Sequence, residues 1–235
     1  MNKDIHMKPG PDFGLVIFSK DEAPTIADVI DGASRYVALN DIFIIDGYSR
    51  DRTVPIVQDK GAHLLFDEGQ GKGSAIRLAI REINRDILIF MDSDGSHRPE
   101  ELPQFFRIFA EHPHVDLVVA SRFKGGSEEL NGSWMEILRF MGNKLSTALI
   151  NVRWHSRLTE VQNGFRAIRR DTAQELCLQE NSFAIEQEMV MKCLQKNKKI
   201  MEFASWEKRR RYNRSHVVPC KMIWPYTLSL FKNIL

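Results

Sequence analysis

Short apolar segments alternate with helix-like segments through the first half of the chain, and this alternation constrains the fold most strongly. The expected strands, apolar on both faces as in a covered parallel sheet, are Phe13–Phe18, Ile42–Ile45, His63–Phe66, Ile87–Met91 and Val115–Ala120. The expected helices between them are Thr25–Arg35, Thr53–Lys60, Ser74–Ile83 and Pro103–Glu111. Because such alternation indicates βαβ units, the sequence to about Arg122 predicts a nucleotide-binding type of α/β unit.

The second half of the chain is less regular. Lys124–Ser133 contains several glycines and predicts a flexible connection, followed by a long helix at Met135–Val152. Further strands are expected at Phe165–Arg169 and Ile200–Phe203, with a helix at Ile185–Lys196 between them. No Pro- or Ser-rich linker separates the halves, so we expect one domain with two lobes.

Composition excludes several classes of protein. The 235 residues suffice for one large domain with a core, and the net charge of +2 argues against a nucleic-acid-binding protein. The three cysteines, Cys177, Cys193 and Cys220, are odd in number and widely spaced, which argues against a disulfide framework or a zinc site and favours the cytoplasm. The N-terminal segment, residues 1–12, is polar, and no apolar run is long enough to span a membrane.

The strongest signal of a functional site is Asp92-Ser93-Asp94, directly after the apolar run Ile87–Met91. In an open α/β sheet, ligands bind at the carboxyl ends of the strands. Hard divalent cations are often held by one or two carboxylates together with a substrate diphosphate. The sequence therefore suggests a metal-assisted site for a phosphorylated ligand. The alternative is an Asp-rich turn whose side chains cap the next helix.

Two other turns follow expected strands. Asp46 is placed to meet a ligand at the edge of the sheet, whereas Asp51 and Thr53 fit better as helix-capping residues. The glycine-rich segment Gly69–Ala75 precedes a helix whose first N–H groups can face an anion, and Lys72 is a candidate diphosphate contact. Its spacing is not that of a Walker loop, and a plain glycine turn is the alternative.

The residues after Asp94 carry both structural and functional expectations. Pro99 is expected to start a helix, and Glu100 and Glu101 suit its first turn for structural reasons. His97 is either a contact for metal or phosphate, or a solvated loop histidine.

The C-terminal tail, residues 216–235, contains apolar residues four positions apart, such as Tyr226, Leu230 and Ile234. This spacing predicts an amphipathic helix. Such a helix packs on its own domain, on a second subunit or on a membrane surface, and the sequence leaves these alternatives open.

Taken together, these segments resemble the family 2 glycosyltransferases with the GT-A fold, and most of all the dolichol- or polyprenol-phosphate mannosyl- and glucosyltransferase branch. The resemblance runs from about Gly14 to Ser215 and is carried by Leu15–Glu22, Asp46–Thr53, Gly71–Ala75, Asp92–Pro99, Ala120–Arg122, Glu160–Arg166 and Arg211–Ser215. The chain departs from the family pattern at several positions. Gly47 replaces a second Asp, Ser96 stands where a metal-contacting Gln is common, and Glu160 stands where Asp is usual.

The resemblance implies an α/β, Rossmann-like GT-A fold with a mixed, mostly parallel sheet flanked by helices. Residues 13–215 would form the glycosyltransferase domain, with a nucleotide-binding lobe at 13–122 and an acceptor lobe at 123–215. The polar segment 1–12 would precede it and the amphipathic tail 216–235 would follow.

The resemblance also implies a donor and a cofactor. The donor would be a UDP- or GDP-sugar, contacted by Glu22, Asp46, Lys72 and Asp92. Asp94, with Asp92, would bind Mg²⁺ or Mn²⁺, which neutralises charge on the leaving diphosphate. The sugar would be transferred with inversion at the anomeric carbon.

Two acceptors fit the resemblance, with Asp92, Asp94, Glu160 and Arg122 as the catalytic residues. A polyprenyl phosphate would be bound by Arg122, Arg139, Arg211, Arg214 and Ser215, since arginine suits phosphate, and would bring the chain to the inner face of the membrane as a peripheral protein. A soluble or glycan hydroxyl acceptor would instead need a general base, for which Glu160 is the candidate. A homodimer is one option for assembly.

A third reading is a sugar nucleotidyltransferase or an inactive nucleotide-sugar-binding protein. Sugar nucleotidyltransferases carry a glycine-rich basic loop after the first strand, where this chain has Ser19–Glu22.

Overall fold

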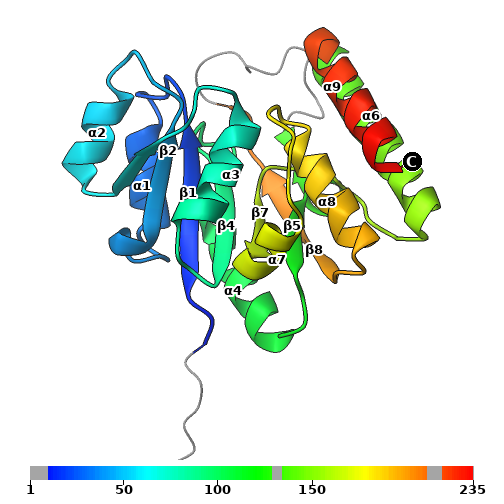
Figure 1. The fold of residues 1–235 in the computed structure, drawn as a ribbon. Coiled ribbons are helices and arrows are strands. Elements are labelled where there is room, and N and C mark those ends of the chain that lie inside the picture. Colours follow the sequence, from blue (N-terminus) through cyan, green and yellow to red (C-terminus); the bar gives the residue numbers. More distant parts are fainter. Residues whose placement is uncertain (1–9, 129–133, 211–218, 235) are drawn as a thin grey trace, which may run out of the picture.

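The computed structural model describes residues 10–128, 134–210 and 219–234 (Figure 1). These residues form one eight-stranded sheet with the strand order β3-β2-β1-β4-β7-β5-β8-β6. The strands are β1 (Phe13–Ser19), β2 (Ile42–Asp46), β3 (His63–Phe66), β4 (Ile87–Asp92), β5 (Leu117–Ser121), β6 (Gly126–Ser127), β7 (Arg166–Arg169) and β8 (Ile200–Glu207). The predicted α/β class is therefore confirmed.

Helices flank the sheet. They are α1 (Ile26–Ala33), α2 (Thr53–Lys60), α3 (Lys72–Glu82), α4 (Leu102–Glu111), α5 (Arg122–Gly125), α6 (Trp134–Trp154), α7 (Arg170–Glu175), α8 (Ile185–Gln195) and α9 (Pro219–Ile234), with 3-10 turns η1 (Leu39–Asp41) and η2 (Pro99–Glu101). Residues along one strand alternate between the two faces. Leu88 and Phe90 of β4 join the core beneath α3, α7 and α8, whereas Ile89 and Met91 join the core beneath α1, α2 and α4.

The sheet is mostly parallel, as expected, with β7 as its antiparallel member among the described strands. β7 lies between β4 and β5, so that Ile168 pairs with Leu88 on one side and Leu117 on the other. The register of the parallel strands matters for the site. Ser19 pairs with Asp46 and Phe18 pairs with Asp92, which brings the ends of β1, β2 and β4 to one edge of the sheet.

Two segments differ from the predictions. The first residues of the expected flexible connection belong to α5 and β6, and both of these elements pack against β8. A Cβ on Gly125 would lie 2.1 Å from the carbonyl oxygen of Ser205, so glycine here permits close approach of two backbones. The strand β3 is an edge strand with His63 and Phe66 exposed, rather than covered on both faces.

The tail forms a helix, as predicted. α9 begins at Pro219, contains Pro225, and lies beside α6 and α8 (Figure 1). The side-chain amide of Gln187 on α8 donates to the carbonyl oxygen of Tyr226 at 3.2 Å, and Leu230 and Ile234 pack on the core. One face of the tail thus packs on its own domain. Within the described ranges, no helix combines the length and apolar character that crossing a bilayer requires.

Candidate active site

The carboxyl end of β4 is the centre of the site. Asp92 is the last residue of β4, and the chain turns at Gly95, which has the left-handed φ of +76°. The backbone N–H of Asp92 donates to Nδ1 of His97 at 3.1 Å, which closes the loop. This loop presents the two predicted carboxylates, Asp92 and Asp94, at the edge where β1 and β2 also end.

Lys72, the first residue of α3, binds Asp92. Its Nζ lies 2.6 Å from Oδ1 of Asp92 and 2.8 Å from Oε1 of Glu186 on α8. Burial opposes the charge of Lys72, but Asp92 and Glu186 outweigh it and raise the pKa above its usual value. Burial also acts to raise the pKa of Asp92, but Lys72 and His97 outweigh it and lower that pKa to about 2. Lysine and aspartate are therefore both charged.

Glu186 is a site residue that sequence reasoning missed, because no local pattern links α8 to β4. Arg166, which is fully buried, fixes the start of α8 by donating from Nη1 to the carbonyl oxygen of Glu186 at 2.6 Å. Gly164 makes room for the ion pairs. A Cβ at this position would lie 2.6 Å from Nζ of Lys72 and 3.0 Å from Oδ2 of Asp92. The motif Glu160–Arg166 thus contributes packing to the site.

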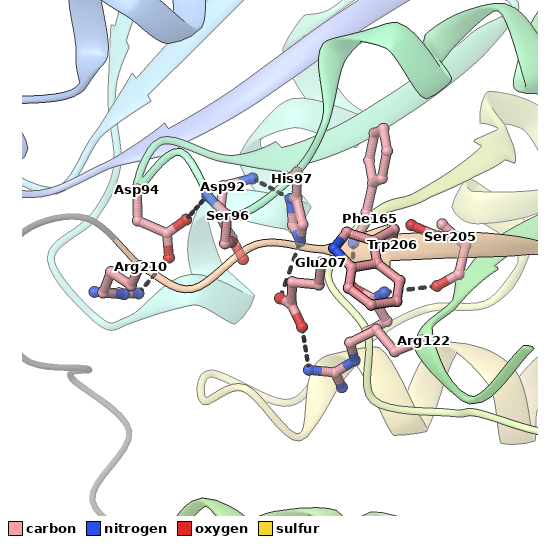
Figure 2. Close-up of polar contacts among 12 residues, drawn as sticks. Asp92, Asp94, Ser96, His97, Arg122, Phe165, Ser205, Trp206, Glu207 and Arg210 are labelled. Atoms are coloured by element: carbon pink, nitrogen blue, oxygen red, sulfur yellow. Dashed lines mark hydrogen bonds and ion pairs between the residues drawn. The ribbon is translucent and has the colours of Figure 1, made fainter. Parts of the chain in front are cut away.

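Asp94 binds an arginine in the segment that follows β8. Nη2 of Arg210 lies 2.6 Å from Oδ2 of Asp94, and its Nη1 lies 3.5 Å from Oε1 of Glu22. The other oxygen of Asp94 accepts the backbone N–H of Ser96 at 2.9 Å. Figure 2 shows the segment after β8 running past the Asp92–His97 loop, so that Arg210 reaches Asp94. The sequence places Arg210 in the basic segment 208–214, but it does not predict the contact with Asp94.

Glu22 contributes a third carboxylate to this cluster. Burial raises its pKa, and the facing Arg210 lowers it in part. Its Oε2 accepts a hydrogen bond from the hydroxyl of Thr25 at 3.2 Å. Glu22 therefore faces a cationic side chain, and its contact to a nucleoside stays a prediction.

These carboxylates fit a divalent cation that a donor diphosphate helps to hold. Within the described residues, no three His, Cys, Asp or Glu side chains gather as a metal site on their own. Mg²⁺ is commonly bound by one or two carboxylates plus substrate phosphates, so two aspartates meet that requirement. The guanidinium of Arg210 at 2.6 Å already shows that Asp94 accepts a positive group in direct contact.

Asp46 shapes its own turn. It is fully buried and accepts hydrogen bonds from the hydroxyls of Ser19 and Ser49 at 2.8 and 2.6 Å and from the N–H of Ser49 at 2.7 Å. Its contact to a nucleoside stays a prediction. Asp51 accepts the N–H of Thr53, the first residue of α2, at 2.9 Å, whereas the N-cap position itself is occupied by Arg52.

A second buried network surrounds Glu160. Its oxygen atoms accept the backbone N–H and the side chain of Arg122, with Nε at 2.7 Å, and the amide of Asn143 at 2.9 Å. Nη1 of Arg122 lies 2.9 Å from Oε2 of Glu207, at the end of β8. Burial opposes ionisation of Arg122, but Glu160 and Glu207 raise its pKa well above the usual value.

His97 belongs to this network. It is buried, stacks on Phe165 with ring centroids 4.9 Å apart, and has Nε2 3.8 Å from Oε1 of Glu207 (Figure 2). The expectation of a solvated loop histidine is therefore wrong. Its Nδ1 accepts the N–H of Asp92 and its Nε2 faces Glu207, so both nitrogens already have protein neighbours.

The structure therefore brings Glu22, Lys72, Asp92 and Asp94 into one cluster and Arg122 and Glu160 into another. Arg139 lies on α6. The predicted phosphate contacts Arg211, Arg214 and Ser215 lie outside the described residues. Glu101 is structural, as expected, and ties η2 to β8 by accepting the N–H of Trp206 at 2.9 Å.

Comparisons with known proteins agree with this geometry. The profile of glycosyl transferase family 2 matches residues 15–177, more than half of the chain. The glycosyltransferase AglJ of Haloferax volcanii is 28% identical over 187 residues, which cover 79% of this chain and 59% of AglJ. The undecaprenyl-phosphate mannosyltransferase of Micrococcus luteus is 26% identical, covering 69% of this chain and 70% of that protein. The dolichyl-phosphate hexose transferase of H. volcanii is also 26% identical, covering 73% and 72%.

A solved structure shows the same fold. Glucosyl-3-phosphoglycerate synthase from Mycobacterium tuberculosis, in complex with Mn²⁺, UDP and phosphoglyceric acid, superposes with a TM-score of 0.76 at 20% identity. The match covers 96% of this chain and 79% of that one. The expected GT-A fold is thus confirmed. Because the family profile matches more than half of the chain, including Asp92 and Asp94, the chain belongs to glycosyl transferase family 2.

Proposed function

We propose that this chain transfers a sugar from a nucleoside-diphosphate sugar to a polyprenyl phosphate, with inversion at the anomeric carbon and with Mg²⁺ or Mn²⁺. The observation that carries the proposal is the cluster at the end of β4, where Asp92 and Asp94 each contact a cationic side chain. A nucleoside diphosphate and its metal ion would offer this cluster a cation for the aspartates and an anion for Lys72 and Arg210. The donor would bind in the lobe 13–122 and the acceptor in the lobe 123–215.

On the donor side, Glu22 and Asp46 would face the nucleoside and Asp92 the ribose. Lys72 holds Asp92 at 2.6 Å, which supports a role in orienting that carboxylate as well as in contacting the donor. Asp94 and Asp92 would hold the metal. When bound, Mg²⁺ or Mn²⁺ would neutralise the charge that develops on the leaving diphosphate.

On the acceptor side, the state of Glu160 favours a phosphate. Both of its oxygen atoms accept hydrogen bonds from Arg122 or Asn143, so that abstracting a proton from a hydroxyl would require breaking them. A phosphate acceptor is already anionic and needs cations rather than a base. Arg122, which Glu160 orients, together with Arg139, Arg211, Arg214 and Ser215, would supply these contacts.

The names of two relatives support a lipid acceptor, since they act on undecaprenyl phosphate and dolichyl phosphate. Such an acceptor would bring the chain to the cytoplasmic face of a membrane as a peripheral protein.

The test has two steps. Melting temperatures are measured with UDP-, GDP- and dTDP-sugars, with and without Mn²⁺, for the wild type and for Asp94→Ala. We expect one donor to raise the melting temperature only with Mn²⁺, and Asp94→Ala to abolish that rise. The donor found is then incubated with a polyprenyl phosphate, and the product is followed by mass spectrometry. Glu100→Ala, an exposed carboxylate of η2, is the matched control and should behave as the wild type.

The outcomes separate the alternatives. Transfer to a soluble sugar but to no polyprenyl phosphate would reject the lipid acceptor, and would give Glu160 the role of general base. Release of pyrophosphate from a nucleoside triphosphate and a sugar phosphate would indicate a nucleotidyltransferase. If no donor shifts the melting temperature, nucleotide-sugar binding itself is contradicted.

A further inference from the structure

The outer face of α6 is apolar and exposed. Leu138, Met141, Leu145, Leu149 and Val152 recur at intervals of three or four residues and lie on one side of the helix, with Val152 75% exposed. α9, which packs beside α6, exposes Trp224 and Phe231. Of the twelve large hydrophobic side chains that are exposed in the described residues, eight belong to these two helices. We call this surface the α6/α9 face.

On α6 and α9, several polar side chains are buried and several apolar side chains are exposed, which is the reverse of the usual arrangement in a surface helix. Although α6 buries Phe140 and Ile150, it also buries the polar Asn143, Ser146 and Thr147. Asn143 donates to Glu160 at 2.9 Å, so the inner side of α6 serves the Arg122 network. On α9, Ser229 is fully buried while Phe231 is 62% exposed. A surface helix normally turns its polar residues toward water and its apolar residues inward.

The net charge of α6 and α9 indicates what kind of surface this face can bind. The sequences of α6 and α9 contain five basic residues, Arg139, Lys144, Arg153, Lys221 and Lys232, against one acidic residue, Glu136. The whole chain, by contrast, has 33 Lys and Arg against 31 Asp and Glu. Two copies of such a face would repel each other, whereas an anionic surface would attract it.

We propose that the α6/α9 face docks on the headgroup region of an anionic lipid bilayer. The exposed apolar side chains would enter the boundary between headgroups and acyl chains, and the lysines and arginines would meet the lipid phosphates. Trp224 suits that boundary because its ring has an apolar body and a polar N–H. The helices would lie in the surface rather than cross it.

This docking would place the catalytic side of the fold close to the lipid phosphates. Asn143 joins the inner side of α6 to Glu160 and thereby to Arg122, and a helix is only about 10 Å across. On the second helix, the carbonyl of Tyr226 accepts from Gln187, the neighbour of Glu186. The proposal agrees with a lipid-phosphate acceptor but does not depend on it, because vesicle binding requires no sugar transfer.

The test is sedimentation of the full chain with vesicles of phosphatidylcholine alone or mixed with phosphatidylglycerol. We expect binding to the mixed vesicles, much weaker binding to phosphatidylcholine alone, and weakening by salt. The double variant Met141→Gln, Leu145→Gln should lower the partition coefficient about tenfold. Tyr36→Gln, which replaces an exposed aromatic residue outside the face, is the matched control and should bind as the wild type.

A second pair of substitutions tests the charge separately. Lys144→Glu with Arg153→Glu should reduce binding to the mixed vesicles without altering the circular dichroism spectrum. The proposal is overturned if the wild type ignores anionic vesicles, or if both pairs bind as well as the wild type. It is also overturned if light scattering finds a dimer that Met141→Gln, Leu145→Gln dissociates, because the face would then cover a second copy.

These readouts are independent of the proposed function. The donor-induced rise in melting temperature should be unchanged in Met141→Gln, Leu145→Gln, since both side chains are exposed on α6, a helix that contributes no residue to the donor cluster. A chain that binds vesicles but transfers no sugar to a polyprenyl phosphate would contradict the proposed function alone. A chain that transfers sugar in detergent but ignores vesicles would contradict the docking alone.

Discussion

The two charged clusters of the site contain the same kinds of side chain but differ in how they are buried. The donor cluster is defined as Glu22, Lys72, Asp92, Asp94 and Arg210. Glu22, Lys72 and Asp94 are largely buried, but the cluster reaches solvent through the side chains of Asp92, 30% exposed, and Arg210, 22% exposed. The buried network, defined as His97, Arg122, Asn143, Glu160 and Glu207, encloses Glu160 completely. Both consist of carboxylates facing cations, but their surroundings differ.

Burial explains what this difference means. A partly exposed ion pair contributes little net stability, so its partners exchange for a ligand at low cost. A buried pair is expensive to break, because removing one partner leaves an uncompensated charge in a low dielectric. The donor cluster is therefore suited to binding, whereas the buried network is suited to holding Arg122 in one position.

The largest expected effect is on turnover in the donor cluster. Asp94→Asn removes the charge that a metal or a cationic side chain contacts, so we expect sugar transfer to fall on the order of 10³-fold. Folding should persist, since the lost contact to Arg210 is partly exposed. Steady-state transfer and thermal melting measure the two effects. Transfer within tenfold of the wild type would remove Asp94 from the metal site.

The second effect is on stability in the buried network. Glu160→Gln leaves Arg122 charged and buried beside a neutral amide, which should lower the free energy of unfolding by about 3 kcal/mol in urea titrations. Glu100→Gln, on an exposed carboxylate, should change it by less than about 0.5 kcal/mol.

A triple variant tests the pairing itself. Adding Arg122→Gln and Glu207→Gln to Glu160→Gln should recover part of the lost stability, because no charge of the three residues is then left without its partner. Equal losses in the single variant Glu160→Gln and in the exposed control would contradict the role assigned to the buried network.

The sequence predicts those parts of the site that depend on local pattern. Asp92 and Asp94 follow an apolar strand, and the parallel register then brings the ends of β1, β2 and β4 together. The strands and most helices follow from the same periodicity. The antiparallel direction of β7 does not, because Arg166–Arg169 has the same apolar pattern in either direction.

The residues that balance the site's charges were not predictable in this way. Glu186 comes from α8 and Arg210 from the segment after β8, and both reach Asp92 or Asp94 only through the three-dimensional packing of distant segments. The inward position of Asn143 likewise depends on which side of α6 faces the sheet. For such residues, spacing along the chain carries no information about the partner.

A smaller effect is expected where the backbone leaves room for the donor cluster. Gly164→Ala would put a Cβ 2.6 Å from Nζ of Lys72 and 2.9 Å from Oε1 of Glu186. Since both atoms are held in ion pairs, we expect a loss of about 1–2 kcal/mol in unfolding free energy. Gly142→Ala on α6, where a Cβ meets nothing within 4 Å, is the matched control and should be neutral or slightly stabilising. Equal stability of the two variants would show that Lys72 moves aside freely.

The smallest expected effect is on cation binding, and it tests whether the donor cluster differs from the buried network. Arg210→Ala removes the guanidinium that occupies Asp94 and Glu22, so a divalent cation no longer competes with it. We expect the affinity for Mn²⁺ without donor, measured by electron paramagnetic resonance, to rise about fivefold, since an ion pair that is open to solvent on the arginine side contributes about 1 kcal/mol. Arg209→Ala is the control, because the exposed Arg209 meets Glu128 through its backbone N–H. Unchanged or weaker Mn²⁺ binding would mean that Arg210 supports the cation site rather than competing for it, and the donor cluster would then resemble the buried network in being fixed before ligands arrive.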